Sequence, residues 1–267
     1  MKLESLTELS NLTPSEARSL IRENKLNRPT YGIASGFTQA NLVVLRKEAA
    51  FEFLLFCQRN QKPCPILDVT EGSPHPKLVA PNADIRTDLG RYRIYREGEL
   101  VDEVTDILKF WEDDMVAFLI GCSFTFERAL LSNGIPLRHM ELGSNVAMYK
   151  TNIECVPAGR FAGPTVVSMR PIPEKDVVRA VQVTSRFPAT HGAPLHIGSP
   201  ESIGIRDINK PDFGDALPIR DGEVPVFWAC GVTPQAVAMQ VKPEIMITHA
   251  PGCMFITDWE EERLTVL

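Results

Sequence analysis

Two short segments place a cysteine beside glycine and hydroxyl side chains, between an apolar run and a helical pattern. They are Gly121-Cys122-Ser123-Phe124-Thr125 and Cys230-Gly231-Val232-Thr233-Pro234-Gln235. The free amides at a helix N-terminus would lower the pKa of a nearby thiol and would also hold a carboxylate. The alternative is that Cys122 and Cys230 are small packing residues where a strand meets a helix.

Histidines follow in two other places. His249 comes directly after an apolar run, and we expect it to share one crevice with Cys230 and Thr233, because successive strands of a β-α-β unit are usually neighbours. His191 lies in a loop with His196 and could ligate a metal with Asp207, but loop spacing alone defines no geometry. Structural hydrogen bonding is the alternative for these histidines, and we predict no metal site.

Arg160 is the first choice for binding an anion. It lies between Gly159 and Gly163, and small residues on each side let the backbone approach a ligand. An arginine fork is a natural clamp for a small carboxylate. A surface salt bridge is the alternative.

Several classes of function lack support in the sequence. The 267 residues contain 28 Lys and Arg against 34 Asp and Glu, a net charge of −6, with no basic run, which argues against nucleic acid or an anionic membrane as partner. The patterns typical of nucleotide-binding loops and of the α/β-hydrolase nucleophile are absent. Residues 115–126 form the longest apolar run, too short to span a bilayer, and Met1–Glu4 does not resemble a signal peptide. We therefore expect a cytoplasmic protein that binds a small molecule.

The local patterns predict most elements. Thr13-Pro14-Ser15-Glu16 has the form of a capping box that starts a helix. The apolar spacing predicts a further helix over 47–60 and strands over 66–69 and 116–120. Further expected elements are a hairpin over 91–101, a helix over 125–131, a strand over 165–169 and a helix over 174–186.

The last third predicts the fold class. A strand over 226–229, a helix over 234–241 and a strand over 245–248 form a right-handed β-α-β unit in a parallel sheet. We therefore predict an α/β fold with a mainly parallel central sheet flanked by helices. Residues 1–132 and 203–267 would form the main domain, and 133–202 a smaller inserted α+β region. An apolar edge of this sheet would allow two copies of the chain to form a homodimer.

Five longer segments together carry a family resemblance. They are residues 29–41, 121–127, 152–164, 190–207 and 229–258. In these segments the chain resembles the D-glutamate cyclase family, many of whose bacterial members are described only as hydro-lyases. The resemblance implies a carbon–oxygen lyase activity on a small amino dicarboxylate, such as closure of D-glutamate to 5-oxo-D-proline with loss of water. Nothing in the sequence requires a metal or an organic cofactor.

That reaction assigns roles to the candidate residues. Ring closure needs a base for the amine, donors for the oxyanion and an acid for the departing oxygen. Arg160 would clamp the carboxylate, and His249 or His191 would carry the proton. The expected oxyanion donors are Ser123 and Thr233, the further substrate contacts are Gly231 and Thr125, and the secondary catalytic candidates are Cys230 and Cys122. The alternatives are a two-cysteine enzyme similar to amino-acid racemases and a non-catalytic module that binds 5-oxoproline or a related acid.

Overall fold

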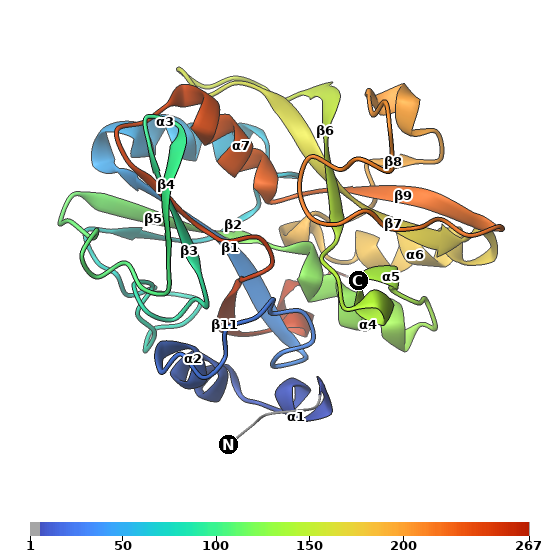
Figure 1. Cartoon of the computed structure of the whole chain (residues 1–267), viewed down its shortest axis with the longest axis horizontal. Helices are drawn as coiled ribbons and strands as arrows, with labels where there is room; N and C mark the ends of the chain where they lie inside the picture. The colour runs from blue at the N-terminus through green and yellow to red at the C-terminus, as the bar shows by residue number, and fades with distance from the viewer. Residues whose placement is uncertain (1–5, 267) are drawn as a thin grey trace.

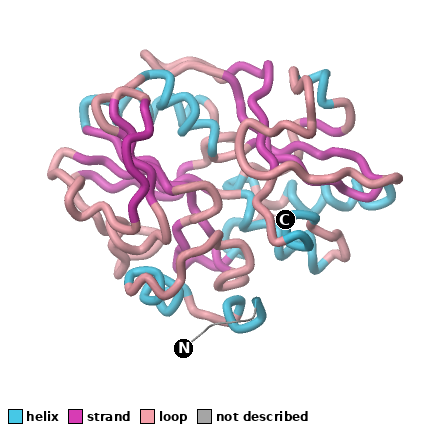
Figure 2. The backbone as a smooth tube through the Cα atoms, viewed as in Figure 1, coloured by secondary structure: helices cyan, strands magenta, loops and turns pink. Residues whose placement is uncertain are grey.

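The computed structural model describes residues 6–266, which form two antiparallel sheets (Figure 1). Figure 2 shows their strands as two separate magenta groups, joined by loops and short helices. The Met1–Glu4 segment considered for a signal peptide lies outside the described residues, as do the outermost ends of the predicted main domain. None of the helices between residues 6 and 266 combines the length and apolar character needed to cross a membrane. The helices are α1 (Leu6–Ser10), α2 (Pro14–Arg22), α3 (Lys47–Arg59), α4 (Glu127–Ser132), α5 (Arg138–Leu142), α6 (Val177–Ser185) and α7 (Val232–Val241).

The larger sheet is built around β1, whose neighbours are β5, β10 and β11. Val43 lies opposite Phe118 of β5 on one side and Thr248 of β10 on the other. Nearly every residue of β1 and β5 is buried, because both faces of the sheet are covered. The strands of this sheet are β1 (Phe37–Arg46), β2 (Ile66–Glu71), β3 (Tyr92–Arg96), β4 (Glu99–Val104), β5 (Met115–Gly121), β10 (Met246–His249) and β11 (Phe255–Glu260).

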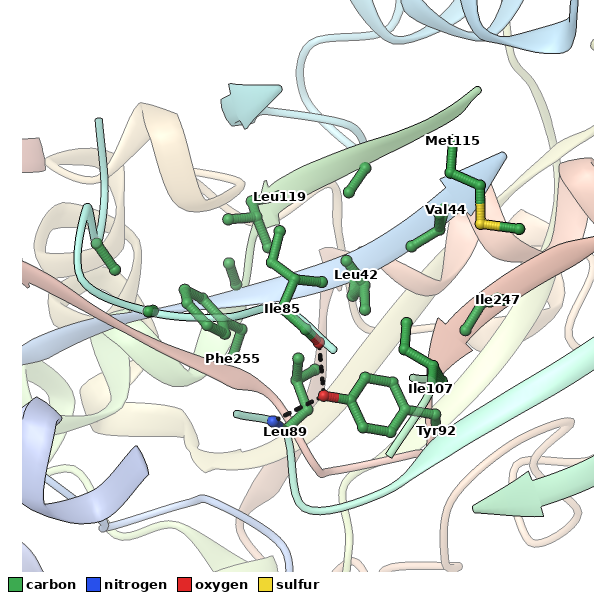
Figure 3. Close-up of a cluster of buried hydrophobic side chains, with 14 of the residues drawn as sticks. Leu42, Val44, Ile85, Leu89, Tyr92, Ile107, Met115, Leu119, Ile247 and Phe255 are labelled. Carbon is green, nitrogen blue, oxygen red and sulfur yellow. Dashed lines mark hydrogen bonds between the residues drawn. The ribbon is translucent and has the colours of Figure 1, made fainter. Parts of the chain in front are cut away.

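One face of this sheet carries a large apolar cluster, in which Tyr92 is fully buried (Figure 3). The Tyr92 hydroxyl donates to the Ile85 carbonyl at 2.6 Å and accepts from the Leu89 amide at 3.0 Å, so the polar end of a core side chain is satisfied. The opposite face packs against α3 and α7 through residues such as Phe53 and Val237.

The smaller sheet has the order β6-β7-β9-β8. Helix α6 packs against one face of this sheet. Its Ala180 belongs to the same buried apolar cluster as Trp228. Its strands are β6 (Ala147–Glu154), β7 (Pro164–Pro173), β8 (His196–Ile197) and β9 (Glu223–Ala229). These strands come from both sides of the predicted domain boundary at residue 202.

The predicted fold class is wrong. Every strand pairing in the described chain is antiparallel, and β9 and β10 belong to different sheets. Helix α7 therefore carries the chain from one sheet to the other and does not close a β-α-β unit. The error has a physical reason: a strand buried on both faces reads as a continuous apolar run whatever its direction.

Several predictions that rest on neighbouring residues are confirmed. Thr13 and Glu16 form the expected capping box, and the hairpin over 91–101 is confirmed as β3 and β4. The helix expected from residue 125 begins with a 3₁₀ turn over Ser123–Phe126 and continues as α4.

Candidate active site

A fully buried arginine links the smaller sheet to the 3₁₀ turn and the helix that follow β5. Arg170 lies on β7, and its guanidinium is flanked by the rings of Phe126 and Trp228, at 5.4 and 5.5 Å from their centroids. It donates from Nη2 to the Ser123 Oγ at 3.0 Å and from Nη1 to the Ser168 Oγ at 3.2 Å. An arginine removed from water needs such partners, because its desolvation is otherwise costly.

The counter-charge is Glu127, the first residue of α4. Arg170 Nε donates to its Oε1 at 3.2 Å, and His139 Nε2 lies 3.1 Å from the same oxygen. No described residue forms a hydrogen bond with the other oxygen, Oε2. Burial opposes ionisation of this carboxyl, but the neighbouring His139 and Arg170 outweigh it and lower its pKa. Glu127 is therefore an ionised carboxylate with one unoccupied oxygen.

Glu127 lines a cavity of about 280 Å³ between the loop before β1, the 3₁₀ turn and α4. A concave space with convergent polar groups is the usual form of a small-molecule site. The lining residues are Thr7, Ser10, Gly32, Ile33, Ala34, Ser35, Phe37, Gln39, Phe124, Glu127, Arg128, Leu131, Met140 and Glu261.

The loop that forms one wall of this cavity has an unusual backbone. Ala34 has a φ of 46°, in the left-handed region that a residue with a Cβ rarely adopts. Its amide donates to the Leu9 carbonyl at 3.0 Å, and the Ser35 amide donates to Ser10 at 2.9 Å. Strain of this kind persists where the surroundings impose it, often at ligand sites. At Gly36 a Cβ would lie 2.4 Å from the Arg128 guanidinium, so glycine allows that cation to approach the loop.

A second carboxyl, Glu261, lines the same cavity. Burial raises its pKa to about 8, although Arg128 opposes the shift. Arg128 Nε lies 3.7 Å from Glu261 and Nη2 lies 3.0 Å from Glu262, so its charge is shared. At neutral pH Glu261 is mostly protonated while Glu127 is ionised. Two carboxyls with pKa values displaced in opposite directions are typical of an acid and base pair.

The predicted residues of the first turn, Gly121–Thr125, lie beside this network. Ser123 accepts from Arg170, and Thr125 is fully buried with its hydroxyl accepting from the Gln39 amide at 3.2 Å. Cys122 precedes the 3₁₀ turn, where its Sγ accepts from the Phe124 amide at 3.5 Å.

The two cysteines of the sequence pattern do come together. Cys122 and Cys230 belong to one buried apolar cluster, which also contains Tyr31 and Met254. Burial raises the pKa of both thiols, that of Cys230 to about 11. They are therefore neutral thiols at physiological pH, in keeping with the packing alternative.

The second turn, Cys230–Gln235, makes structural contacts. The Thr233 hydroxyl accepts from the Val166 amide at 2.9 Å and lies 3.2 Å from the Val166 carbonyl. A Cβ on Gly231 would lie 2.0 Å from the Asn41 amide nitrogen, so glycine makes room for that side chain. These contacts fasten the start of α7 to β7 and β1, and neither Gly231 nor Thr233 lines the Glu127 cavity.

The predicted histidines lie elsewhere. His249 contacts the Leu42 amide at 3.1 Å and the Gln235 side chain at 2.8 Å, at a narrow separate cavity. His191 contacts the Lys62 carbonyl at 2.9 Å. Burial lowers the pKa of both to about 4. Each is therefore neutral at pH 7, when it can accept a proton but has none to donate as an imidazolium.

Arg160 is 43% exposed, and its Nε lies 3.3 Å from Glu52. It lines a small surface cavity and is not brought together with Glu127. The residues that sequence reasoning missed are His139, Arg170, Glu261 and the role of Glu127. Glu127 stands in a segment of the family resemblance, but nothing in the local pattern links it to residues on other elements.

Comparison with known proteins identifies the family. The D-glutamate cyclase family model matches residues 116–258. The chain is 69% identical to "Putative hydro-lyase YcsI" of Bacillus subtilis, with 96% of this chain and 100% of that protein covered. It is also 69% identical to "Putative hydro-lyase BLi00500/BL02808" of Bacillus licheniformis, with 97% and 99% covered, and 64% identical to a "Putative hydro-lyase" of Stutzerimonas stutzeri, with 98% and 100% covered. The chain therefore belongs to the D-glutamate cyclase family.

Proposed function

We propose that this chain is a hydro-lyase that cyclises a small amino dicarboxylate, such as D-glutamate, to its 5-oxo product in the cavity between Glu127 and Glu261. The names of its relatives support a lyase. The observation that carries the proposal is the pair of carboxyls, one ionised and one protonated, in a single cavity. The ligand would be a free carboxylate in the cytoplasm.

In this reaction two protons leave the nitrogen and two reach the departing oxygen, so no net proton is gained or lost. The α-ammonium group loses two protons, its nitrogen bonds to the γ-carboxyl carbon, and one carbon–oxygen bond breaks. The departing oxygen takes up two protons and leaves as water. Ionised Glu127 accepts one of these protons as the nitrogen attacks, and protonated Glu261 donates one to the departing oxygen. The second proton leaves the ammonium to solvent water and returns from solvent to the departing oxygen. Transfer of the proton from Glu127 back to Glu261 through solvent then restores both carboxyls. Because the ring closes within one molecule, holding the substrate folded supplies much of the rate.

Other residues orient this pair. Arg170 holds Glu127 through Oε1, and Ser123 and Ser168 hold Arg170, which leaves Oε2 without a hydrogen-bond partner among the described residues. Ser123 is thus a positioning residue in this proposal. Arg128, which borders the cavity, takes the role of carboxylate clamp that the sequence suggested for Arg160.

The test is direct. Purified protein is incubated with D-glutamate, and 5-oxoproline is followed by NMR. Glu127→Gln and Glu261→Gln should each lower kcat by at least about 100-fold, while Glu260→Gln, at an exposed position outside the cavity, should change it little. Arg160→Ala and His249→Ala are assayed in parallel. The rate should also fall above about pH 8, as Glu261 loses its proton. Full activity in Glu127→Gln, or no product from a panel of amino and hydroxy dicarboxylates, would overturn the proposal.

Two alternatives predict other outcomes. A two-cysteine enzyme, suggested by the shared cluster of Cys122 and Cys230, would exchange the Cα proton in deuterated water without losing water. The raised pKa of both thiols argues against it. A binding module would show ligand-dependent thermal stabilisation without turnover.

A further inference from the structure

A second cavity, of about 250 Å³, shares no lining residue with the first. Three arginines and one carboxylate line it: Arg28, Arg91, Arg93 and Glu103. Its remaining wall includes Pro251 and Cys253. An arginine-lined cavity of this size suits a small anion, because guanidinium groups bind carboxylates as planar forks.

The charges in this cavity do not balance. Arg91 Nη1 lies 3.2 Å from Glu103 and Arg93 Nε lies 2.9 Å from it, so a single carboxylate serves two arginines. Arg28 forms no ion pair with any described residue. Its guanidinium lies 5.5 Å from the centroid of the Tyr31 ring, and its Nη2 donates to the Tyr31 hydroxyl at 3.4 Å. The four side chains therefore leave two positive charges without a protein partner.

The fold holds these arginines in place before any ligand arrives. Arg91 directly precedes β3, and Arg93 is its second residue. The two are two residues apart on extended chain, so they project from the same side. The loop that carries Arg28 is fixed by the Thr30 amide, which donates to the Gly252 carbonyl at 2.8 Å, and by the Cys253 thiol, 3.8 Å from the Arg28 carbonyl. Preorganised cations lose little freedom on binding.

We propose that this cavity is a second ligand site, which binds a small dicarboxylate. One carboxylate would pair with Arg28 and the other with Arg91 and Arg93, which matches the two unbalanced charges. The methylene groups between them would pack against the apolar wall formed by Ala250 and Pro251. Inorganic phosphate offers the charge without that apolar part, so it should bind more weakly. The site does not depend on the proposed catalysis, because the two cavities have separate walls.

Calorimetric titration of the full chain with glutarate tests the proposal, since glutarate has no amine and cannot cyclise. Arg28→Gln should weaken glutarate binding by about tenfold or more, the usual cost of losing a charged hydrogen bond. Glu103→Gln should strengthen it, because the change frees Arg91 and Arg93. A higher glutarate affinity in Glu103→Gln cannot come from partial unfolding of the variant, because a damaged fold would lower the affinity.

Two controls locate the site. Arg96→Gln alters an exposed arginine at the end of β3 outside the cavity, and Arg128→Gln alters the first cavity. Arg96→Gln should leave glutarate binding unchanged. Arg128→Gln should leave the affinity of the second cavity unchanged, because any change that it causes belongs to the first cavity. The proposal is overturned if Arg128→Gln abolishes binding while Arg28→Gln does not, if phosphate binds more tightly than glutarate, or if glutarate does not bind at all. Turnover of D-glutamate is measured separately, so loss of one proposal leaves the other standing.

Discussion

The first turn, Gly121–Thr125, and the second turn, Cys230–Gln235, have similar sequences but meet different surroundings. The hydroxyl of Ser123 contacts a buried charged side chain, Arg170, whereas the hydroxyl of Thr233 contacts the backbone of Val166. The first turn leads into α4, whose first residue is Glu127, at the edge of a cavity. The second leads into α7, which crosses between the sheets.

The comparison shows that the residues packed against such a turn decide whether it forms part of a polar site. The same sequence pattern, a glycine, a cysteine and a hydroxyl residue after an apolar strand, can lie beside a binding cavity or make only structural contacts. Only the first turn is opposed by a buried arginine, and only there does a carboxylate retain an unoccupied oxygen. Four measurements test this contrast, beginning with the largest expected effect.

Replacing Arg170 with methionine should destabilise the protein by about 3–5 kcal/mol, because Glu127 would be left as a buried charge without its main partner. The free energy of unfolding in urea at pH 7 measures the cost. In the second turn, Thr233→Val leaves the Val166 amide unpaired and should cost less, about 1–3 kcal/mol. Equal costs would mean that the two turns do not differ as described.

Acid should destabilise both turns through their neighbouring histidines. The folded-state pKa of His191 and of His249 is depressed from 6.5 to about 4 by burial, so the unfolded chain binds more protons between these values. Stability is then fully present above pH 6.5 and falls as the pH drops towards 4, by up to about 3 kcal/mol for each histidine.

The measurement is the unfolding free energy between pH 4 and 7. Two variants, His191→Asn and His249→Gln, should each reduce the loss of unfolding free energy between pH 7 and pH 4. Asparagine is chosen for position 191 because it tolerates the left-handed backbone there. The partly exposed His196→Gln should leave the pH dependence of the unfolding free energy unchanged. The same pH dependence as the unmodified protein in both buried variants would contradict this prediction.

The glycines of the two turns should differ in their tolerance of alanine. A Cβ on Gly121 would lie 2.2 Å from the Ala189 carbonyl, which is backbone, whereas a Cβ on Gly231 would meet the Asn41 side chain. Overpacking costs about 1–3 kcal/mol, and we expect Gly121→Ala near the upper end and Gly231→Ala near the lower. Thermal unfolding of the two variants checks the order.

The smallest expected effect is that of Ser123→Ala, about 1 kcal/mol, because Arg170 keeps Glu127 and Ser168 as partners. Chemical denaturation against Ser132→Ala, an exposed serine of α4, measures it. If Ser123 only positions Arg170, the substitution should lower kcat for D-glutamate more than it raises KM. A pure rise in KM would instead make Ser123 a substrate-binding residue.

Local chemistry determined the elements that are set by neighbouring residues. The capping box at Thr13 and Glu16, the helix over Lys47–Arg59 and the β3–β4 hairpin follow from contacts within a few residues, so their patterns are legible in the sequence. The family resemblance could also be recognised in the sequence, since it rests on contiguous segments of the chain.

The tertiary structure alone decided the direction of the strands and the composition of the site. Burial on both faces erases the alternation that would reveal an exposed face, so β9 and β10 looked like neighbours although they belong to different sheets. Arg170 is 43 residues from Glu127 in the chain, and Glu261 lies on a separate segment after β11. Their pKa values depend on burial and on partners brought from distant elements, which no local pattern encodes.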